Sequence, residues 1–438
     1  MGYNKNTMAE SQTIFVCASC GEEYLRWQGR CDNCGNWNTL KEFKAPRKES
    51  RRPSFKFVSS EVVKLSEIKS AHLARLSSKI GEFDRVLGGG IVPGSIMILG
   101  GDPGIGKSTL LLQLSANIEK VLYISGEESL SQIKMRFDRL KVKAKTLKIL
   151  SEINLGEIFL AIEKEKPKVV IVDSIQAVYS EEFPSTPGSI VQVRECALRL
   201  QQLAKSSQTP IILVGHVTKD GTVAGPRTLE HLVDVVLYLE GEAFHESRIL
   251  RSVKNRFGAI EEIGIFEMTE KGMIEVCNPS KLLLSERQAN VPGNVVTATV
   301  EGSRSLLLEV QALTSQTVFG YPQRRTSGFD QNRLQLLVAV LQKRAGLSLS
   351  SQDIFVNIVG GIKIREPAVD LAVALAVAGS FKGKPIDPQL CVFGEVGLSG
   401  EIRQVPFEAK RKSEAKRLGF SKFLNYQTIN EAVRCLDV

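Results

Sequence analysis

A glycine-rich stretch between an apolar run and a helix-like run constrains this chain more than any other feature. Ile96–Gly100 precedes the stretch, Thr109–Ile118 follows it, and the stretch matches the pattern GxxxxGK[ST]. The candidate nucleotide-binding residues are Gly101, Asp102, Pro103, Gly104, Ile105, Gly106, Lys107, Ser108 and Thr109. The glycines let successive backbone N–H groups face phosphate oxygens, and the start of a helix adds positive potential. The pattern predicts an ATP site on a strand–loop–helix unit.

Three side chains are expected to complete the phosphate and magnesium site. Lys107 would place its ammonium group at the β- and γ-phosphates, and the hydroxyl of Ser108 would ligate Mg²⁺. The apolar run Val169–Asp173 ends in a carboxylate, and such an aspartate holds Mg²⁺ through its water shell in P-loop enzymes. Taken alone, an aspartate at the end of a strand is commonly a turn cap.

Hydrolysis also needs a carboxylate that orients or deprotonates water. The run Val121–Ser125 is followed by Gly126, Glu127 and Glu128, so that two carboxylates lie beside the expected phosphate site. One of them is predicted to be the general base, and the sequence does not separate the two. The alternative is that both are acids at a helix N-terminus, favoured by the helix dipole.

The region from about 57 to 280 is predicted to be one α/β domain. Its apolar runs are Ile96–Gly100, Val121–Ser125, Val169–Asp173, Ile211–Gly215 and Val235–Leu239. They are continuously apolar, as parallel strands covered on both faces require, and helix-like stretches separate them. This pattern indicates a doubly wound sheet. After a break at 280–293, a second α/β or α+β domain is expected over 290–438. Its expected strands and helices are Val295–Glu301, Leu306–Gln311, Asp330–Arg344 and Pro367–Ala378.

Four of the eight cysteines lie in two CxxC pairs within residues 14–40: Cys17, Cys20, Cys31 and Cys34. Each tight turn brings two sulfurs to one face, and two such turns close a tetrahedron around a structural zinc ion. A redox CxxC pair would need no second turn. Because this segment has few apolar residues, metal binding would supply its folding energy. The two tryptophans, Trp27 and Trp37, are expected to cover the zinc site.

The charge distribution permits a nucleic-acid partner without proving one, since the net charge is +9. Residues 41–56 carry seven basic residues against two acids and are expected to be a solvated basic linker. Polar residues fill Met1–Thr13, which argues against a signal peptide. The most apolar predicted helix, Ala368–Phe381, is too short to span a bilayer and carries Asp370. A soluble, cytoplasmic protein with no membrane partner is therefore expected.

Several segments resemble the bacterial RadA (Sms) family of RecA-like DNA-repair ATPases. Leu87–Ser95, before the P-loop, looks like the RecA, KaiC and RadA group, and Lys254–Gly258 resembles the signature pentapeptide of the RadA family. Gly215–Gly221, Ala224–His231 and the cysteine cluster resemble that family too, so the resemblance covers nearly the whole chain. It implies a RecA-type P-loop ATPase core, preceded by a C4 zinc finger and followed by an α+β Lon-protease-like domain of ribosomal S5-like fold.

The resemblance also implies roles for residues outside the P-loop. His216 would be a γ-phosphate sensor, although a lone histidine is more often structural. Lys254 and Arg256 would reach the nucleotide of a neighbouring subunit in a homo-oligomeric ring, a hexamer, and would also contact DNA. Two candidate DNA loops, Tyr179–Ser189 and Thr218–Leu229, are equally well explained as ordinary mobile loops. The second loop carries Lys219 and Arg227 as DNA-binding candidates.

The resemblance implies a DNA-stimulated ATPase with Mg²⁺ and Zn²⁺ that translocates on single-stranded DNA or unwinds it, a helicase-type motor. It would assist branch migration of recombination intermediates in repair, with the RecA recombinase as a candidate partner. The zinc finger would serve DNA, a partner helicase or stability. Direction of movement, preferred DNA structure and ring size are left open.

Two alternatives remain: a KaiC-like ATP-switched ring that binds protein, and a Lon-like protease. The protease is disfavoured because Ala368 occupies the serine slot of that family and has no hydroxyl. The partner lysine slot falls at about Ala409, next to Lys410. Six cations of this domain are secondary DNA contacts or plain solvated surface: Arg324, Arg325, Lys343, Arg344, Lys363 and Arg365.

Overall fold

The computed structural model describes residues 13–17, 22–24, 26–44, 74–144, 146–183, 185–215, 229–241, 247–318 and 320–437. These residues belong to two compact units. The first comprises residues 1–79 and 89–237, and the second comprises residues 80–88 and 238–438. The domain boundaries expected from the sequence stay predictions.

The cysteine-rich segment folds into a small antiparallel sheet, with the strand order β2-β1-β3. Its strands are β1 (Thr13–Cys17), β2 (Glu23–Tyr24) and β3 (Leu40–Lys44). Among the described side chains, its buried core comprises Cys17, Cys31 and Leu40, with Phe15 and Tyr24 packed against it. So few apolar side chains supply little burial energy, which leaves a metal ion to stabilise the fold. β3 extends four residues into the stretch that the sequence assigns to the linker.

The first unit contains a parallel sheet with the order β4-β8-β7-β5-β6. Its strands are β4 (Ile96–Gly101), β5 (Val121–Ser125), β6 (Lys148–Ser151), β7 (Val169–Asp173) and β8 (Ile211–Val214). All residues of β4, β5 and β8 are buried, as expected for strands covered on both faces. β6 is polar at both ends and was not expected from the sequence.

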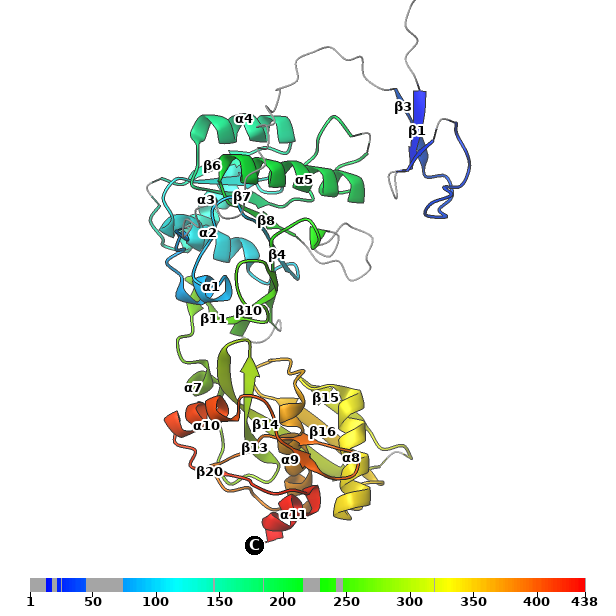
Figure 1. Ribbon diagram of the computed structural model, residues 1–438, viewed down its shortest axis with the longest axis vertical. Coiled ribbons are helices and arrows are strands. Elements are labelled where there is room, and N and C mark those ends of the chain that lie inside the picture. The colour runs from blue at the N-terminus through cyan, green and yellow to red at the C-terminus, as the bar shows by residue number, and fades with distance from the viewer. Residues whose placement is uncertain are drawn as a thin grey trace, which may run out of the picture. The chain divides into compact units, whose positions relative to one another are not determined.

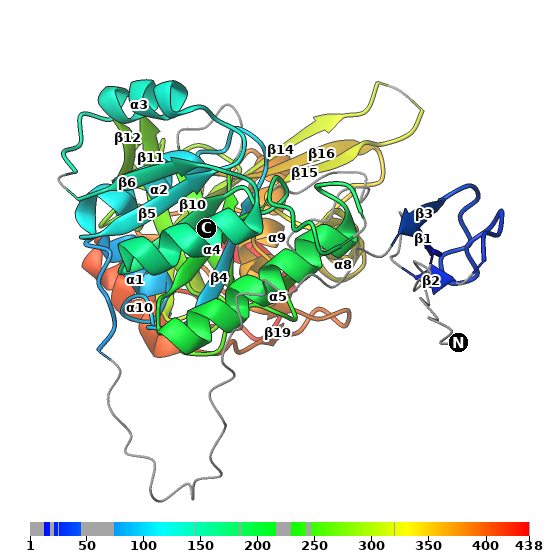
Figure 2. The same ribbon diagram turned by 90° about the horizontal axis from the view of Figure 1, so that it is seen from above.

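Helices cover both faces of this sheet. They are α2 (Lys107–Asn117), α3 (Leu130–Arg139), α4 (Leu155–Glu165) and α5 (Ile190–Ser207). In Figures 1 and 2, α4 and α5 lie on one side of the strands and α2 on the other, so the doubly wound arrangement is confirmed. Ser129 begins α3 with a capping box, and Asn154 and Ser189 cap α4 and α5. α2 is the exception, because it begins at Gly106 without a side-chain cap.

The strand β9 (Val235–Glu240) passes from the first unit into the second after Leu237. In the second unit, β10 (Ser247–Asn255), β11 (Ile263–Thr269) and β12 (Gly272–Glu275) form an antiparallel meander. The short helix α1 (Gly81–Val86) packs on β10 and β11. A Cβ atom on Gly264 would lie 2.6 Å from the carbonyl oxygen of Glu82, so this close packing requires glycine.

The rest of the second unit is a six-stranded mixed sheet with the order β15-β16-β14-β13-β17-β20. Its strands are β13 (Asn294–Glu301), β14 (Arg304–Gln316), β15 (Arg324–Ser327), β16 (Gln352–Ile358), β17 (Leu390–Cys391) and β20 (Lys422–Phe423). A separate hairpin pairs β18 (Glu395–Val396) with β19 (Ile402–Arg403). The helices are α7 (Pro279–Leu283), α8 (Gln331–Ala345), α9 (Asp370–Lys382), α10 (Glu408–Arg417) and α11 (Ile429–Arg434), with 3₁₀ turns η2 (Pro367–Val369) and η3 (Cys435–Asp437).

The helix α9 forms the centre of this core. Ten consecutive residues, Asp370 to Gly379, are buried, which marks a helix covered on all sides. It packs against β13, β14, α8 and α11. In the part of the chain that the structure describes, no helix combines the length and apolar content that crossing a bilayer needs.

Candidate functional site

The loop between β4 and α2 has the backbone geometry of a phosphate cradle. Gly104 and Gly106 adopt φ angles of 77° and 115°, in the region that favours glycine. Gly106 is the N-cap of α2, and no side chain accepts a hydrogen bond from the first turn there. The first turn also lacks an acidic residue. The open N–H groups and the helix dipole therefore face the loop together, which is the arrangement that binds an anion.

Lys107 lies inside this loop, with its residue 4% exposed. Its Nζ donates to the carbonyl oxygens of Gly101, at 2.8 Å, and Asp102, at 2.9 Å. Burial lowers the pKa of the Lys107 ammonium, while the negative charges of Asp173, Asp102 and Glu127 oppose that shift. These two backbone contacts hold the ammonium group at the loop.

Asp173, at the end of β7, is oriented by a residue that the sequence did not indicate. The hydroxyl of Tyr123, in the adjacent strand β5, donates a hydrogen bond to its carboxylate. Burial, and next the charge of Asp173, raise the pKa of Tyr123 well above its usual value. The phenol therefore stays protonated and remains a donor. Its position inside an apolar run made it look like an ordinary core residue.

The structure gives the two candidate glutamates different partners. Glu127 accepts a hydrogen bond from the hydroxyl of the buried Ser174, directly after Asp173. The Glu128 carboxylate forms an ion pair with Arg136 of α3, and its backbone N–H donates to Ser125 at 3.0 Å. Lys107, Glu127, Glu128, Asp173 and Arg136 line one cavity of about 310 Å³. Further lining residues include Gly104, Gly106, Ser108, Thr109 and Arg139.

Several predicted site residues lie elsewhere or outside the described residues. His216, Lys219 and Arg227 fall outside them. Lys254 and Arg256 lie at the end of β10 and just after it, on the expected hairpin, where Lys254 is half-buried and Arg256 is exposed. The buried Asn255 between them fixes the turn: its Oδ1 accepts from the N–H of Phe257 at 2.9 Å and its Nδ2 donates to Leu87 O at 3.4 Å.

The cysteine cluster has the geometry of a zinc site in its described part. The sulfurs of Cys17, Cys31 and Cys34 lie within 4.8 Å of one another, and Cys20 lies outside the described residues. Cys17 Sγ and Cys34 Sγ are 3.7 Å apart. Zn–S bonds of about 2.3 Å in a tetrahedron place sulfurs about 3.8 Å apart, so the residues present fit zinc. Thr39 and Tyr24 hydroxyls lie 3.2 Å and 3.3 Å from the sulfurs of Cys17 and Cys31.

The expected covering of this site by tryptophans is wrong. Trp27 is 58% exposed and Trp37 is 69% exposed. Both indole rings lie against Gly29 instead, and the guanidinium of Arg30 stacks over the Trp37 ring, 5.9 Å from its centre. The ribbon's core is too small to enclose two indoles, so their rings stay at its surface.

The segment that resembles the Lon active site holds a structural ion pair. Ala368 is 3% exposed, and two residues earlier Glu366 binds Arg411 of α10 through two hydrogen bonds of 2.8 Å and 2.7 Å. Arg411 is almost fully buried and also donates to the carbonyl oxygens of Ala298 and Pro406. A guanidinium remains protonated in proteins and cannot serve as a general base.

Together, the doubly wound sheet, the phosphate loop and the carboxylates at its strand ends define a RecA/KaiC-like P-loop ATPase core, carried with an N-terminal zinc ribbon. Two family models match parts of this chain. The family model "AAA domain" matches residues 63–222, and the model "Rubredoxin metal binding domain" matches residues 15–42. A KaiC-like protein of Pyrococcus horikoshii is a structural match with 19% identity and a TM-score of 0.39, covering 47% of this chain and 99% of that one.

The particular family follows from curated relatives. The DNA repair protein RadA of Bacillus subtilis is 50% identical over 427 residues, which is 95% of this chain and 93% of that protein. The protein of the same name from Listeria monocytogenes is 49% identical and covers 94% of this chain, with 92% of its own length aligned. This chain belongs to the RadA family of DNA repair proteins.

Proposed function

We propose that this protein is a DNA-stimulated ATPase of DNA repair that moves along single-stranded DNA or unwinds it, and that it promotes branch migration of recombination intermediates. The observation that carries the proposal is the convergence of Lys107, Asp173 and Glu127 on one cavity at the uncapped start of α2. Membership of the RadA family supports the repair role.

Within this cavity we assign the general base to Glu127. Its carboxylate is at the cavity, exposed to solvent and hence to the attacking water, and Ser174 orients it. The carboxylate of Glu128 forms an ion pair with Arg136, and we assign it a structural role at the site. The P-loop N–H groups and Lys107 stabilise negative charge on the transferring phosphoryl group. Bound Mg²⁺ would neutralise phosphate charge, held by Ser108 and, through water, by Asp173.

The ATP-driven work is assigned to a homo-oligomeric ring, a hexamer. In it, Lys254 and Arg256 reach the nucleotide of the neighbouring subunit, and His216 senses the γ-phosphate. The buried Asn255 supports this role, because it holds the turn that carries both cations. Lys219, Arg227 and the loop Tyr179–Ser189 contact DNA phosphates. The zinc ribbon contacts DNA or a protein partner such as the RecA recombinase.

The C-terminal domain is assigned as a Lon-like scaffold without proteolytic activity. Ala368 lacks a nucleophile, and the neighbouring Glu366 is bound to Arg411. The same pair supports a rigid scaffold, because a buried ion pair with further backbone acceptors fixes two elements in one geometry.

The proposal is tested by ATP turnover of the full chain with and without single-stranded DNA, at low salt, for the parent and Lys107→Ala. We expect turnover that DNA stimulates in the parent and that is lost in the variant. A parent that hydrolyses ATP at the same rate with and without DNA would favour a KaiC-like protein-binding switch and overturn the motor. Casein digestion by the parent would instead establish a protease.

A further inference from the structure

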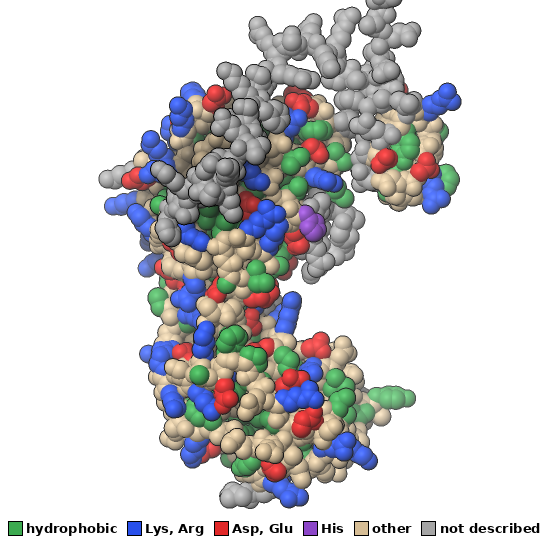
Figure 3. Space-filling view, viewed as in Figure 1, with side chains coloured by type: hydrophobic (Ala, Val, Ile, Leu, Met, Phe, Trp, Pro, Cys, Tyr) green, Lys and Arg blue, Asp and Glu red, His purple; other side chains and the backbone are tan. Residues whose placement is uncertain are grey.

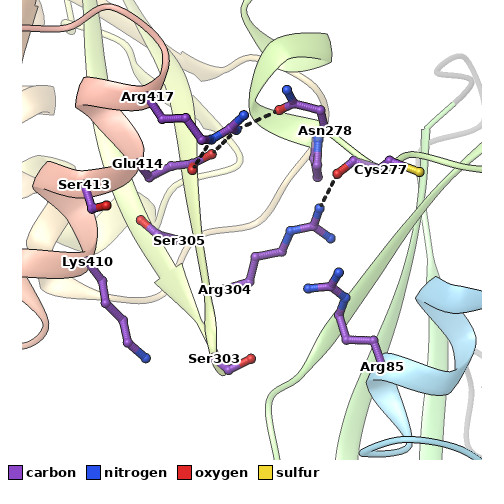
Figure 4. A pocket seen from close by; sticks show the side chains of 11 residues that line it. Arg85, Cys277, Asn278, Ser303, Arg304, Ser305, Lys410, Ser413, Glu414 and Arg417 are labelled. Atoms are coloured by element: carbon purple, nitrogen blue, oxygen red, sulfur yellow. Dashed lines mark hydrogen bonds and ion pairs between the residues drawn. The ribbon is translucent and has the colours of Figure 1, made fainter.

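A second cavity, of about 400 Å³, lies in the second unit and has no part in the ATP site. Four cations from three elements line it: Arg85 of α1, Arg304 at the start of β14, and Lys410 and Arg417 of α10. Figure 4 shows the guanidinium groups of Arg85 and Arg304 beside each other, whereas the side chain of Lys410 extends from α10 apart from both. The face of the molecule in Figure 3 shows basic side chains scattered among acidic ones, so such convergence is not a general property of that surface.

The carboxylates at this cavity do not balance its cations. Glu82 binds two guanidiniums, with Arg304 at 2.8 Å and Arg85 at 3.3 Å, and also accepts from the N–H of Ile265. Glu414 is occupied by Arg417, at 2.8 Å, and by the hydroxyl of Ser280. Two carboxylates therefore pair with the three guanidiniums. A third carboxylate, that of the buried Glu262, accepts from the N–H and the hydroxyl of the lining residue Ser303, at 2.7 Å and 3.0 Å.

The ammonium of Lys410 adds a further positive charge. It lies 5.2 Å from the centre of the Phe407 ring and has no carboxylate within ion-pair distance among the described residues. With Glu82, Glu414 and Glu262 counted against the four cations, the cavity carries an excess of about one positive charge, which matches the single negative charge of a nucleic-acid backbone phosphate.

Arg304 is held in place with donors to spare. Its side chain is 11% exposed, and it donates to Glu82 and, at 3.1 Å, to the carbonyl oxygen of Cys277. A guanidinium has five N–H donors in a planar fork, so further donors face the cavity. Burial lowers the pKa of Arg304, which reflects a charge with little solvent around it. A group that is desolvated and already positioned gains more from an anion than a mobile surface cation does.

The other lining residues restrict the ligand class. Ser305 and Ser413 offer hydroxyl groups, and the described residues that line the cavity include no aromatic ring. Without an aromatic platform there is no stacking surface for a base, so recognition would fall on charge and oxygen acceptors alone. Arginine forks suit the oxygens of phosphate, to which they donate pairs of hydrogen bonds.

We propose that this cavity is a second, base-independent phosphate-binding site, and that it takes a backbone phosphate of single-stranded nucleic acid. The nucleic-acid source rests on the proposed function, whereas the phosphate chemistry rests on the four cations alone. A free phosphate compound is the other source of the same chemistry, and the experiment separates the two.

The first measurement is the affinity of the full chain for a labelled oligothymidylate as a function of salt. The variants are Arg85→Gln/Lys410→Gln, which removes two exposed cations and keeps the Glu82–Arg304 pair, and the control Lys416→Gln. Lys416 lies exposed on the same helix and does not line the cavity. The slope of log K against log salt changes by about 0.7 for each phosphate contact in single-stranded DNA, so loss of the one phosphate at this cavity is expected to reduce the magnitude of the slope by about 0.7 in the double variant.

The second measurement is calorimetric titration with inorganic pyrophosphate in a Lys107→Ala background, which weakens the ATP site. Pyrophosphate binding that disappears in the double variant, with an unchanged oligothymidylate slope, would keep the phosphate site and overturn the nucleic-acid source. If neither probe distinguishes the double variant from Lys416→Gln, the site is overturned. Failure of the parent protein to bind DNA would overturn the proposed function. The pyrophosphate titration would still test whether this cavity binds phosphate.

Discussion

The hydroxyl of Tyr123 donates a hydrogen bond to the carboxylate of Asp173, 50 residues away in sequence and in the neighbouring strand. The contact fixes the direction in which Asp173 presents its oxygens. Since the phenol is buried and its pKa is raised, it acts only as a donor across the physiological range. The orientation of this carboxylate thus depends on the pairing of β5 with β7.

Removing the hydroxyl of Tyr123 is expected to weaken magnesium use. In Tyr123→Phe, Asp173 loses its donor, and loss of such an outer partner typically costs about 10- to 100-fold in metal affinity. The free energy of unfolding should fall by about 1.5–3 kcal/mol, as for a lost hydrogen bond to a charged group. Magnesium titration of ATP turnover and urea unfolding measure both effects. Tyr426→Phe is the control, and equal midpoints for the two variants would refute the role of Tyr123.

The two adjacent glutamates should differ in kinetics. Glu127→Gln is expected to lower kcat by about 10²- to 10⁴-fold with nucleotide binding retained, because the variant keeps the shape and loses the base. Glu128→Gln weakens an ion pair with Arg136 and should reduce kcat far less. Single-turnover hydrolysis, with nucleotide binding measured separately, distinguishes them. A larger loss in Glu128→Gln would reverse the assignment.

Zinc removal should unfold the ribbon and leave the ATPase core folded. In the part of the ribbon that the structure describes, three residues form the buried core, so the metal is expected to supply much of its stability. Both tryptophans of the chain lie in the ribbon against Gly29, which makes their near-ultraviolet circular dichroism a specific reporter. A chelator should abolish that signal together with zinc release and leave nucleotide affinity unchanged. Retention of the tryptophan signal after complete zinc release would contradict the prediction.

Restoring a serine should not create a protease. In Ala368→Ser the new hydroxyl would lie at a position that is 3% exposed, close in sequence to a carboxylate held by a permanently charged guanidinium. No casein cleavage above that of the parent is expected. Cleavage that appears in Ala368→Ser and is blocked by a serine-directed inhibitor would show that a competent base is present after all.

The buried pair in the same domain should matter for stability instead. Arg411→Met leaves Glu366 without its partner and is expected to lower the free energy of unfolding by about 3–5 kcal/mol. The matched control is Arg403→Met, which breaks the exposed ion pair with Glu401 and should lower the free energy of unfolding far less. Urea denaturation of the full chain compares them. Equal losses would mean that burial contributes nothing to the Arg411 pair.

Local signals explain what the sequence could reveal. The P-loop was predictable because its glycines, lysine and flanking runs are contiguous, and the zinc knuckles for the same reason. The strand β6 is not predictable from the sequence because Lys148–Ser151 is short and has no continuously buried run. Tyr123 and Ser174 join the site only through strand order and through contacts across 50 and 47 residues, which no local pattern carries. Glu127 and Glu128 could be separated only by their distant partners, Ser174 and Arg136.

Gly126, directly before the proposed base Glu127, is packed so closely that a larger residue would not fit there. A Cβ atom there would lie 2.5 Å from that of Ala177, and Ala177 stands between Ser174 and the loop that begins at Tyr179. The backbone before Glu127 therefore packs directly against the segment that leads into that loop. In the proposed motor, a DNA strand that displaces this loop would also displace the backbone before Glu127, and DNA binding would thereby be coupled to hydrolysis.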